Sequence, residues 1–117
     1  DQTKRALINL VNNAVAAVGE AGRVTLRTRS LPGEGKVEVE VTDTGVGIPP
    51  EDRERLFLPY FSTKKSGTGL GLAIVYRIVT EHGGAIRVEA NEPRGTRMVM
   101  TFPALRAPAP AVPPASR

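Results

Sequence analysis

Four short segments in which polar and apolar residues alternate place the strongest constraint on the fold of this chain. In residues 23–29 and 36–42, valine, leucine or threonine occupies one side and mostly arginine or glutamate the other. Alternation with a period of two predicts β-strands, and the Leu-Pro-Gly-Glu-Gly stretch between them predicts a hairpin whose outer face pairs arginine against glutamate. Residues 85–90 and 97–102 repeat this arrangement around a turn at residues 91–95. Two hairpins, each with one apolar face, need helices to cover them.

Segments with helical periodicity precede and separate the two hairpins. Residues 70–81 predict a helix that ends at His82-Gly-Gly, and residues 51–57, which follow two prolines, predict a short helix. Residues 3–18 predict the first helix, whose apolar side contains Leu7, Leu10, Val11, Ala14 and Val18. The order of these elements predicts an α+β fold, a two-layer α/β sandwich in which helices cover one face of a mixed, mostly antiparallel sheet.

The first predicted helix carries an unusual set of amide side chains. Asn9, Asn12 and Asn13 fall on one side of it, opposite its main apolar side. Ile8 and Val15 make the flanks apolar as well. We therefore expect this helix to be buried on most sides, with the amides facing a polar partner.

Composition excludes several classes of function. The 117 residues include no cysteine and one histidine, which excludes disulfides, thiol nucleophiles, zinc–cysteine sites and multi-histidine metal centres. The pI of 10.0 reflects a net charge of only +4, without a basic block, and the chain has only five aromatic residues, so no nucleic-acid partner is expected. No run approaches the ~18 apolar residues of a membrane span, and we expect no direct membrane contact.

The length predicts a single domain over residues 1–103. Residues 104–117 are rich in alanine and proline and contain four prolines, so we expect a disordered tail.

Two glycine clusters suggest places where the backbone approaches a ligand. They are Asp43-Thr-Gly45-Val-Gly47-Ile48 and Gly67-Thr-Gly69-Leu-Gly71, the second of which opens a predicted helix. Free N–H groups at a helix start bind phosphate, but neither cluster matches a P-loop or a dinucleotide-binding motif. Taken alone, each cluster is equally consistent with a tight turn.

Taken in order, four segments resemble the motifs of the ATP-binding catalytic domain of sensor histidine kinases. That domain belongs to the GHKL superfamily, which includes type II topoisomerases and mismatch-repair ATPases and has the Bergerat-type ATP-binding fold. The resemblance covers residues 1–103, and the wording of the N and F boxes is closest to kinases of the nitrogen-regulation type. The segments are Asn9-Leu-Val-Asn-Asn13-Ala14 (N box), Asp43-Thr-Gly45-Val-Gly47-Ile48-Pro (G1 box), Phe57-Leu-Pro-Tyr-Phe61-Ser-Thr-Lys64 (F box) and Gly67-Thr-Gly69-Leu-Gly71-Leu (G2 box).

The resemblance implies a site for ATP and Mg²⁺. Asn13 would be the Mg²⁺ ligand, since its amide oxygen suits a hard cation, and Asn9 would steady the phosphates. Asp43 would accept a hydrogen bond from the adenine amino group, with help from Thr96. The alternative role of Asp43 is that of a turn-capping residue. Residues 58–68 would be the ATP lid, and Phe57 and Phe61 would either anchor it or simply pack in the core. The remaining nucleotide contacts would be Gly45, Gly47 and Ile48 on the purine side, Lys64 and more weakly Lys65 in the lid, and Gly67, Thr68, Gly69, Leu70 and Gly71 at the phosphates.

This sequence departs from the pattern of its superfamily at informative places. Hydrolytic members have a glutamate at the position of Asn9, and an amide cannot take a proton from water, so we expect ATP to be held without rapid hydrolysis. Ala16 stands where a basic residue is often found. His82 fits a helix-end contact better than a phospho-acceptor. The chain also starts where the family has already formed a strand or two, so we expect N-terminal strands to be missing.

The leading hypothesis is a histidine kinase catalytic domain. It would bind Mg-ATP and donate the γ-phosphoryl group to a histidine on a separate dimerisation and acceptor domain, upstream of a response regulator. We expect a monomeric, cytoplasmic domain, whether or not its parent protein is anchored in the inner membrane. One alternative is a nucleotide-binding regulatory module, a degenerate kinase without phosphotransfer. Another is a serine kinase of the anti-sigma type, which the asparagine at position 9 disfavours.

Overall fold

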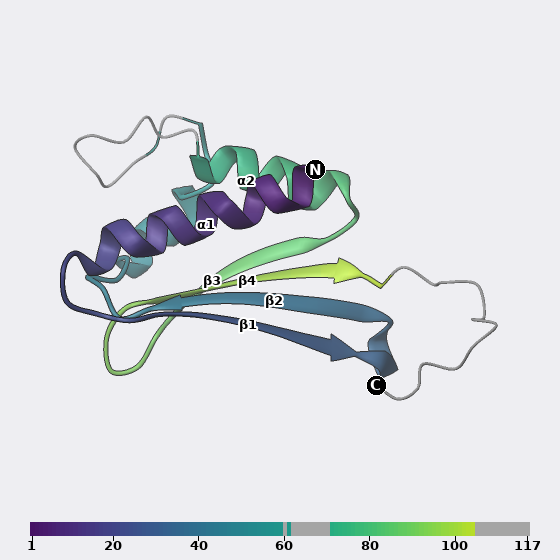
Figure 1. The fold of residues 1–117 in the computed structure, drawn as a ribbon. Coiled ribbons are helices and arrows are strands. Elements are labelled where there is room, and N and C mark those ends of the chain that lie inside the picture. The colour runs from purple at the N-terminus through teal and green to yellow at the C-terminus, as the bar shows by residue number, and fades with distance from the viewer. Residues whose placement is uncertain (60, 62–70, 105–117) are drawn as a thin grey trace.

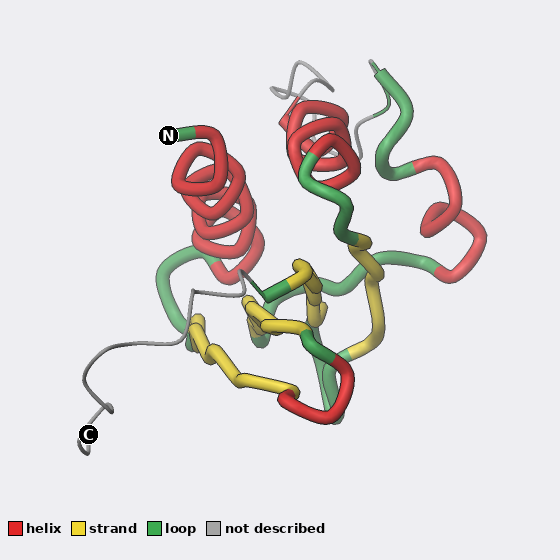
Figure 2. Tube along the Cα trace, turned by 90° about the vertical axis from the view of Figure 1, so that its right-hand side faces the viewer, coloured by secondary structure: helices red, strands yellow, loops and turns green. Residues whose placement is uncertain are grey.

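Two helices lie side by side on one face of a four-stranded sheet (Figure 1). The computed structural model describes residues 1–59, 61 and 71–104. Within these residues the strands have the order β1-β2-β4-β3, every pairing is antiparallel, and no described element covers the face away from the helices (Figure 2). The predicted two-layer α+β architecture is confirmed. Its elements are α1 (Gln2–Val18), β1 (Val24–Leu31), β2 (Lys36–Asp43), α2 (Gly71–Glu81), β3 (Ala85–Ala90) and β4 (Thr96–Pro103), with 3₁₀ helices at Pro32–Glu34 and Pro50–Arg55.

Glycine ends α2 and turns the chain toward β3. The N–H of Gly84 donates to the carbonyl oxygen of Val79 at 2.9 Å, and Gly83 has a φ of 75°, as in a Schellman motif. The ring nitrogen Nδ1 of His82 lies 2.7 Å from the carbonyl oxygen of Ile78. The predicted helix end, including the contact of His82 with it, is therefore confirmed.

One helix differs in type from the prediction. The sequence predicts a short helix over residues 51–57, and the structure forms a 3₁₀ helix at Pro50–Arg55. Two prolines supply no N–H at its start, and so short a segment has few i to i+4 hydrogen bonds available. The N–H of Asp52 donates instead to the carbonyl oxygen of Pro49 at 2.9 Å.

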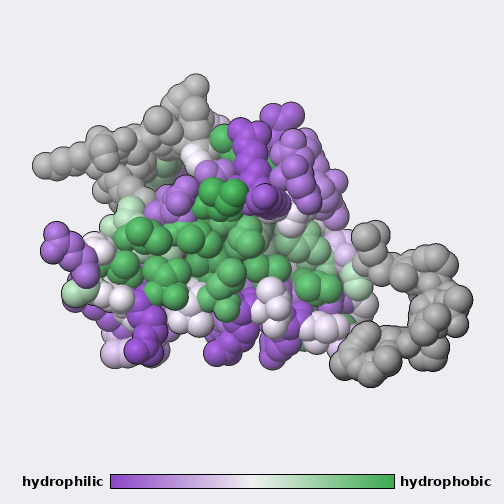
Figure 3. Space-filling model, viewed as in Figure 1, coloured by the Kyte–Doolittle hydropathy of each residue, from purple (hydrophilic) through white to green (hydrophobic). Residues whose placement is uncertain are grey.

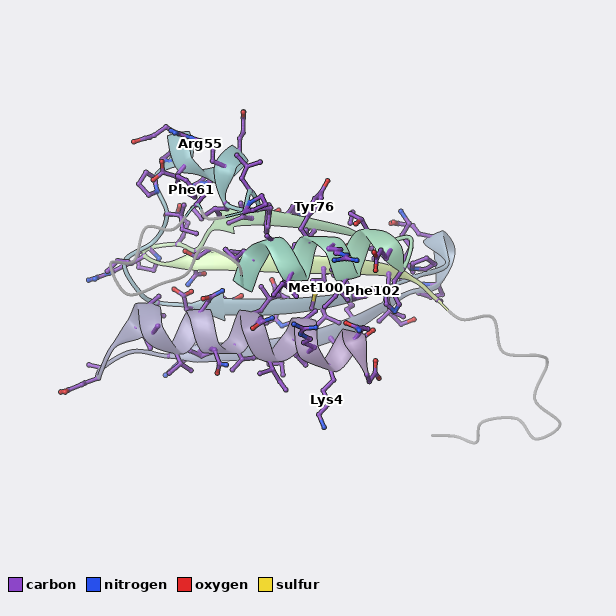
Figure 4. The ribbon with its side chains drawn as sticks, turned by 90° about the horizontal axis from the view of Figure 1, so that it is seen from above. Lys4, Arg55, Phe61, Tyr76, Met100 and Phe102 are labelled. Atoms are coloured by element: carbon purple, nitrogen blue, oxygen red, sulfur yellow. The ribbon has the colours of Figure 1, made fainter. Side chains whose placement is uncertain are left out.

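The hydrophobic core lies between the two helices and the sheet. In the view from above, Met100 and Phe102 of β4 lie beside α2 (Figure 4). Phe102 also meets the ring of His82 edge to face, with ring centroids 6.4 Å apart. The buried core residues are Ala6, Leu10 and Ala14 of α1, Val41 of β2, Leu56 at the end of the second 3₁₀ helix, Val75, Ile78 and Val79 of α2, and Met98 and Met100 of β4.

The expectation that α1 is buried on most sides is wrong. Only Ala6, Leu10 and Ala14 of this helix are buried, whereas Ile8 is 48% exposed and Val15 is 52% exposed. The reason is that α1 contacts α2 and β2 along one side and no described element covers the other side. Figure 3 shows apolar side chains gathered on this face of the molecule. Leu26 of the edge strand β1 is also half-exposed.

The opposite face of the sheet is covered by its own charged side chains. Glu38 and Glu40 point away from the helices, as predicted, but each is only 7% exposed because arginines of neighbouring strands lie over them. Val99, the cross-strand partner of Glu40, is fully buried on this face. The predicted pairing of arginine against glutamate is confirmed, and it extends across all four strands. The ion pairs form one chain in the order Arg29, Glu38, Arg87, Glu89, Arg97, Glu40 and Arg27.

This chain of ion pairs predicts a dependence of stability on pH. A hydrogen bond from Arg87 lowers the pKa of the Glu89 carboxyl below its ordinary value of 4.5. A carboxyl whose pKa is lowered by folding stabilises the fold above its unfolded pKa, and this stabilisation is lost as the pH falls through the folded pKa. We therefore expect the free energy of unfolding to decrease as the pH is lowered past 4.5. Glu89→Gln should reduce this acid-induced loss of unfolding free energy by about 0.5 kcal/mol. The effect is small because water partly screens the Arg87–Glu89 ion pair.

Urea unfolding between pH 3 and pH 7 measures this effect. Glu54→Gln is the control, because Glu54 is exposed and has no ion pair among the residues that the structure describes. Equal pH dependence of Glu89→Gln and the wild type would contradict the assignment.

Candidate nucleotide-binding site

The Asp43 carboxylate is buried and held at the end of β2. Its oxygen Oδ1 accepts two backbone hydrogen bonds, from the N–H of Gly45 at 2.8 Å and from the N–H of Thr96 at 3.2 Å. Asp43 is only 6% exposed, and a buried carboxylate needs such donors. Both donors bind the same oxygen, so the orientation of the carboxylate is set while Oδ2 lies outside this pair of bonds. The structure thus brings together Asp43 and Thr96, two of the residues predicted for the site.

The turn after β2 is packed tightly against the end of α1. A Cβ on Gly45 would lie 2.4 Å from the carbonyl oxygen of Ala17, so only glycine allows this approach. The hydroxyl of Thr44 accepts from the N–H of Arg23 at 2.8 Å, and the N–H of Thr44 donates to the carbonyl of Arg23 at 3.1 Å. Gly47, with a φ of 80°, completes the turn. The close approach at Gly45 is therefore one of helix backbone to turn backbone.

The amide side chains of α1 face different surroundings. Asn9 and Asn13 are partly buried, and Asn12 is exposed. Figure 1 shows the C-terminal part of α1, the start of α2 and the end of β2 at the same end of the molecule. Three predicted parts of the site therefore lie toward this end of the molecule: Asn13 of α1, Gly71 at the start of α2, and the turn that follows Asp43.

The other predicted site residues divide into two groups. Ile48 is partly buried and packs against the core cluster, close in sequence to the turn. Lys64, Lys65 and residues 67–70, which include Gly67, Thr68, Gly69 and Leu70, lie outside the described residues. Their predicted roles stay predictions.

Aromatic side chains fix the chain just before that segment. The ring of Phe57 stacks on Tyr76 of α2 with centroids 5.7 Å apart. The guanidinium of Arg55 lies over the ring of Phe61, 5.5 Å from its centroid (Figure 4). Both phenylalanines also pack against the hydrophobic core, which is the alternative role expected for them, and their anchoring of a lid stays a prediction.

The turn between β3 and β4 supplies contacts that sequence reasoning missed. The Asn91 side chain donates to the carbonyl oxygen of Asp43 at 3.0 Å, and Nε of Arg94 donates to that of Gly45 at 2.9 Å. Gly95, with a φ of 114°, lies directly against Asp43. The only sequence signal was the turn composition itself, Asn-Glu-Pro-Arg-Gly, which does not say what the turn touches.

Comparisons with known proteins identify the class of this domain. Residues 1–106 match the family model described as "Histidine kinase-, DNA gyrase B-, and HSP90-like ATPase". The sensor histidine kinase ZraS of Salmonella typhi is 42% identical over 105 residues, which are 90% of this chain and 22% of that protein. The histidine kinase/phosphatase NtrB of Vibrio alginolyticus is 40% identical over 116 residues, which cover 91% of this chain and 33% of that protein.

Solved structures agree with these relatives. The catalytic domain of histidine kinase ThkA has a TM-score of 0.78 and 42% identity, covering 87% of this chain and 66% of that one. The structure of ThkA in complex with response regulator TrrA has a TM-score of 0.73 and 38% identity, and the match covers 87% of this chain and 28% of that one. Full-length ShkA in complex with AMPPNP has a TM-score of 0.80 and 36% identity, and the match covers 92% of this chain and 22% of that one.

The chain belongs to the histidine kinase-, DNA gyrase B- and HSP90-like ATPase family, and within it this is the ATP-binding catalytic domain of a sensor histidine kinase. The expected likeness to nitrogen-regulation kinases is confirmed by NtrB. The chain spans between a fifth and a third of the length of these two curated relatives. None of the helices in the described ranges has the length and hydropathy that crossing a membrane requires.

The contact between Gly45 and α1 can be tested by adding one methyl group. Gly45→Ala should force the turn away from Ala17, lowering the free energy of unfolding by about 1–3 kcal/mol and weakening ATP binding. Gly33→Ala is the matched control, because a Cβ there meets nothing within 4 Å. Thermal unfolding and calorimetric ATP titration of both variants measure the difference, and equal behaviour would show that the turn is not packed as described.

Proposed function

We propose that this domain binds Mg-ATP with its adenine against Asp43 and donates the γ-phosphoryl group to a histidine on another domain. The observation that carries the proposal is the buried Asp43 carboxylate, which two backbone N–H groups hold by one oxygen. The other oxygen is suited to accept a hydrogen bond from the adenine amino group. ATP binding is the property of the family to which the chain belongs, and the related ShkA has been solved with AMPPNP.

The remaining roles follow the order of the motifs. We assign Thr96 to the adenine side, together with the Gly45–Gly47 turn and Ile48. We assign Asn9, Lys64 and the Gly67–Gly71 segment, with Thr68, Gly69 and Leu70, to the phosphates. Backbone N–H groups at the start of α2 would stabilise phosphate charge.

The residues present fit a Mg²⁺ ion that is held mainly by the nucleotide. The described part of the chain has no group of three or more His, Cys, Asp or Glu side chains that could hold a metal by itself. Mg²⁺ at nucleotide sites commonly takes one or two protein oxygens and completes its shell with phosphates and water. Asn13 would supply such an oxygen from α1. When bound, the ion would neutralise charge on the β- and γ-phosphates.

Asn9 lies on α1 where a hydrolytic enzyme would need a general base. An amide cannot accept a proton from water, so this side chain orients groups without activating a nucleophile. The domain should therefore keep ATP intact until an acceptor histidine is presented. Catalysis would then consist of positioning and charge stabilisation.

The acceptor belongs to a partner domain in this proposal. His82 is the sole histidine of the chain, and its ring contacts the end of α2. The partners we propose are the dimerisation and acceptor domain of the parent kinase and, downstream, a response regulator, the kind of protein found with ThkA. We propose a cytoplasmic monomer without nucleic-acid or membrane contacts, whose parent can be anchored in the inner membrane.

Asp43→Asn tests the adenine contact with little change of shape. The amide keeps an oxygen for the N–H groups of Gly45 and Thr96 and places an NH₂ group where the adenine amino group must donate. We expect ATP affinity to fall about 10-fold to 100-fold, since a hydrogen bond to a charged group is lost. Isothermal titration with MgATP measures it, and unchanged affinity would refute the role of Asp43.

Asn13→Ala tests the metal contact separately. We expect weaker ATP binding in the presence of Mg²⁺ and little change in its absence, because only the metal-linked part of the affinity is removed. Asn12→Ala is the control, since Asn12 is exposed on the same helix. Equal losses with and without Mg²⁺ would count against Asn13 as a ligand.

Phosphotransfer is tested by mixing the domain with a separately produced dimerisation and acceptor domain from its parent protein. With [γ-³²P]ATP we expect label on the acceptor histidine, and no label when that histidine is changed to glutamine. Tight ATP binding without labelling would favour the regulatory module that lacks phosphotransfer. Acid-labile and base-stable label is the signature of phosphohistidine, and label on serine would point to a serine kinase.

A further inference from the structure

We propose that Asn91 and Arg94, in the turn between β3 and β4, are positioning residues for purine recognition. Their side chains hold the backbone on both sides of Thr44 and thereby set where the Asp43 carboxylate meets the base. This inference rests on the proposed function, in which Asp43 binds adenine.

The two side chains bind successive points of the same short segment. The amide nitrogen Nδ2 of Asn91 donates to the carbonyl oxygen of Asp43 at 3.0 Å and to that of Arg94 at 3.1 Å. Nε of Arg94 donates to the carbonyl oxygen of Gly45 at 2.9 Å. The Asn91 amide therefore links Asp43 to the backbone of the turn. The Arg94 guanidinium links the turn to Gly45.

The turn and the segment also touch through their backbones. A Cβ on Gly95 would lie 1.9 Å from the carbonyl oxygen of Asp43 and 2.8 Å from Cα of Thr44. The carbonyl oxygen of Gly95 lies 3.6 Å from the position of a Cβ on Gly47. With this little free space, a displacement of the turn must displace residues 43–45.

The same segment determines the orientation of the carboxylate. Oδ1 of Asp43 is held by the N–H of Gly45 and by the N–H of Thr96, which follows the turn. Gly45 is thus bound at its N–H by Asp43 and at its carbonyl by Arg94. If the Arg94 bond is lost, Gly45, whose N–H orients the carboxylate, loses the anchor on the peptide group that follows it.

The consequence concerns the choice between adenine and guanine. Adenine presents an amino group to a carboxylate at position 6, whereas guanine presents a carbonyl oxygen, which a fixed carboxylate repels. Discrimination of this kind requires the polar group to be held in place, because a mobile one can move away from the wrong base. Loosening residues 43–45 should therefore weaken ATP binding more than it changes GTP binding.

Asn91→Ala and Arg94→Met remove the two donors while leaving Asp43 in place. We expect each to weaken MgATP binding about threefold to tenfold, the range for one hydrogen bond, and to lower the ratio of ATP affinity to GTP affinity. Arg94→Lys retains a donor and should restore part of the MgATP affinity and part of the preference for ATP over GTP. Titration calorimetry with MgATP and MgGTP gives the affinities, and thermal unfolding without nucleotide reports on stability.

Glu92→Ala is the matched control in the same turn. Glu92 is exposed, and the described residues include no hydrogen bond or ion pair to its side chain. This variant should bind both nucleotides as the wild type does.

Two results would overturn the inference without touching the proposed function. One is unchanged ATP affinity and unchanged discrimination between ATP and GTP in Asn91→Ala and Arg94→Met, while Asp43→Asn still binds ATP more weakly. The other is an equal loss of ATP and GTP affinity that parallels a loss of thermal stability, which marks a purely structural role. If Asp43→Asn itself binds ATP normally, the proposed function fails instead.

Discussion

The antiparallel pairing of β2 with β4 is the constraint on which the rest of the structure depends. It sets Asp43 opposite Thr96, so that a residue at the end of one central strand receives a hydrogen bond from the first residue of the other. β2 and β4 are also the two inner strands, and each pairs with one outer strand. The same pairing therefore places the site carboxylate and joins the two hairpins into one sheet.

No element among the described residues covers one face of the sheet, and the charged side chains of the sheet shield that face. Glu38 and Glu40 are buried, yet each has arginine partners on other strands of the sheet. Long arginine side chains can cover apolar groups such as Val99 while their charges stay near water. A two-layer domain of this size thus needs helices on one side only, which leaves α1 and α2 for the side on which Asp43 lies.

The sequence predicted regular structure well, because alternation and helical periodicity are local signals. It also predicted that Asp43 and Thr96 act together, through the resemblance of ordered motifs. It could not predict the contacts of Asn91 and Arg94, whose partners lie 48 and 49 residues away and are backbone carbonyl groups that leave no pattern in the sequence. The exposure of Ile8 and Val15 was missed for a related reason, since an apolar side chain does not reveal whether anything covers it.

The turn that follows Asp43 also provides a place to observe the domain at work. Val46, between two glycines of that turn, is 74% exposed, and the chain contains no thiol. A single cysteine introduced there would be chemically unique and could carry an environment-sensitive fluorophore beside the carboxylate, without disturbing the packed neighbours of Gly45. The combination of a rigid backbone anchor and an outward-facing side chain makes this position a natural attachment point for an optical reporter.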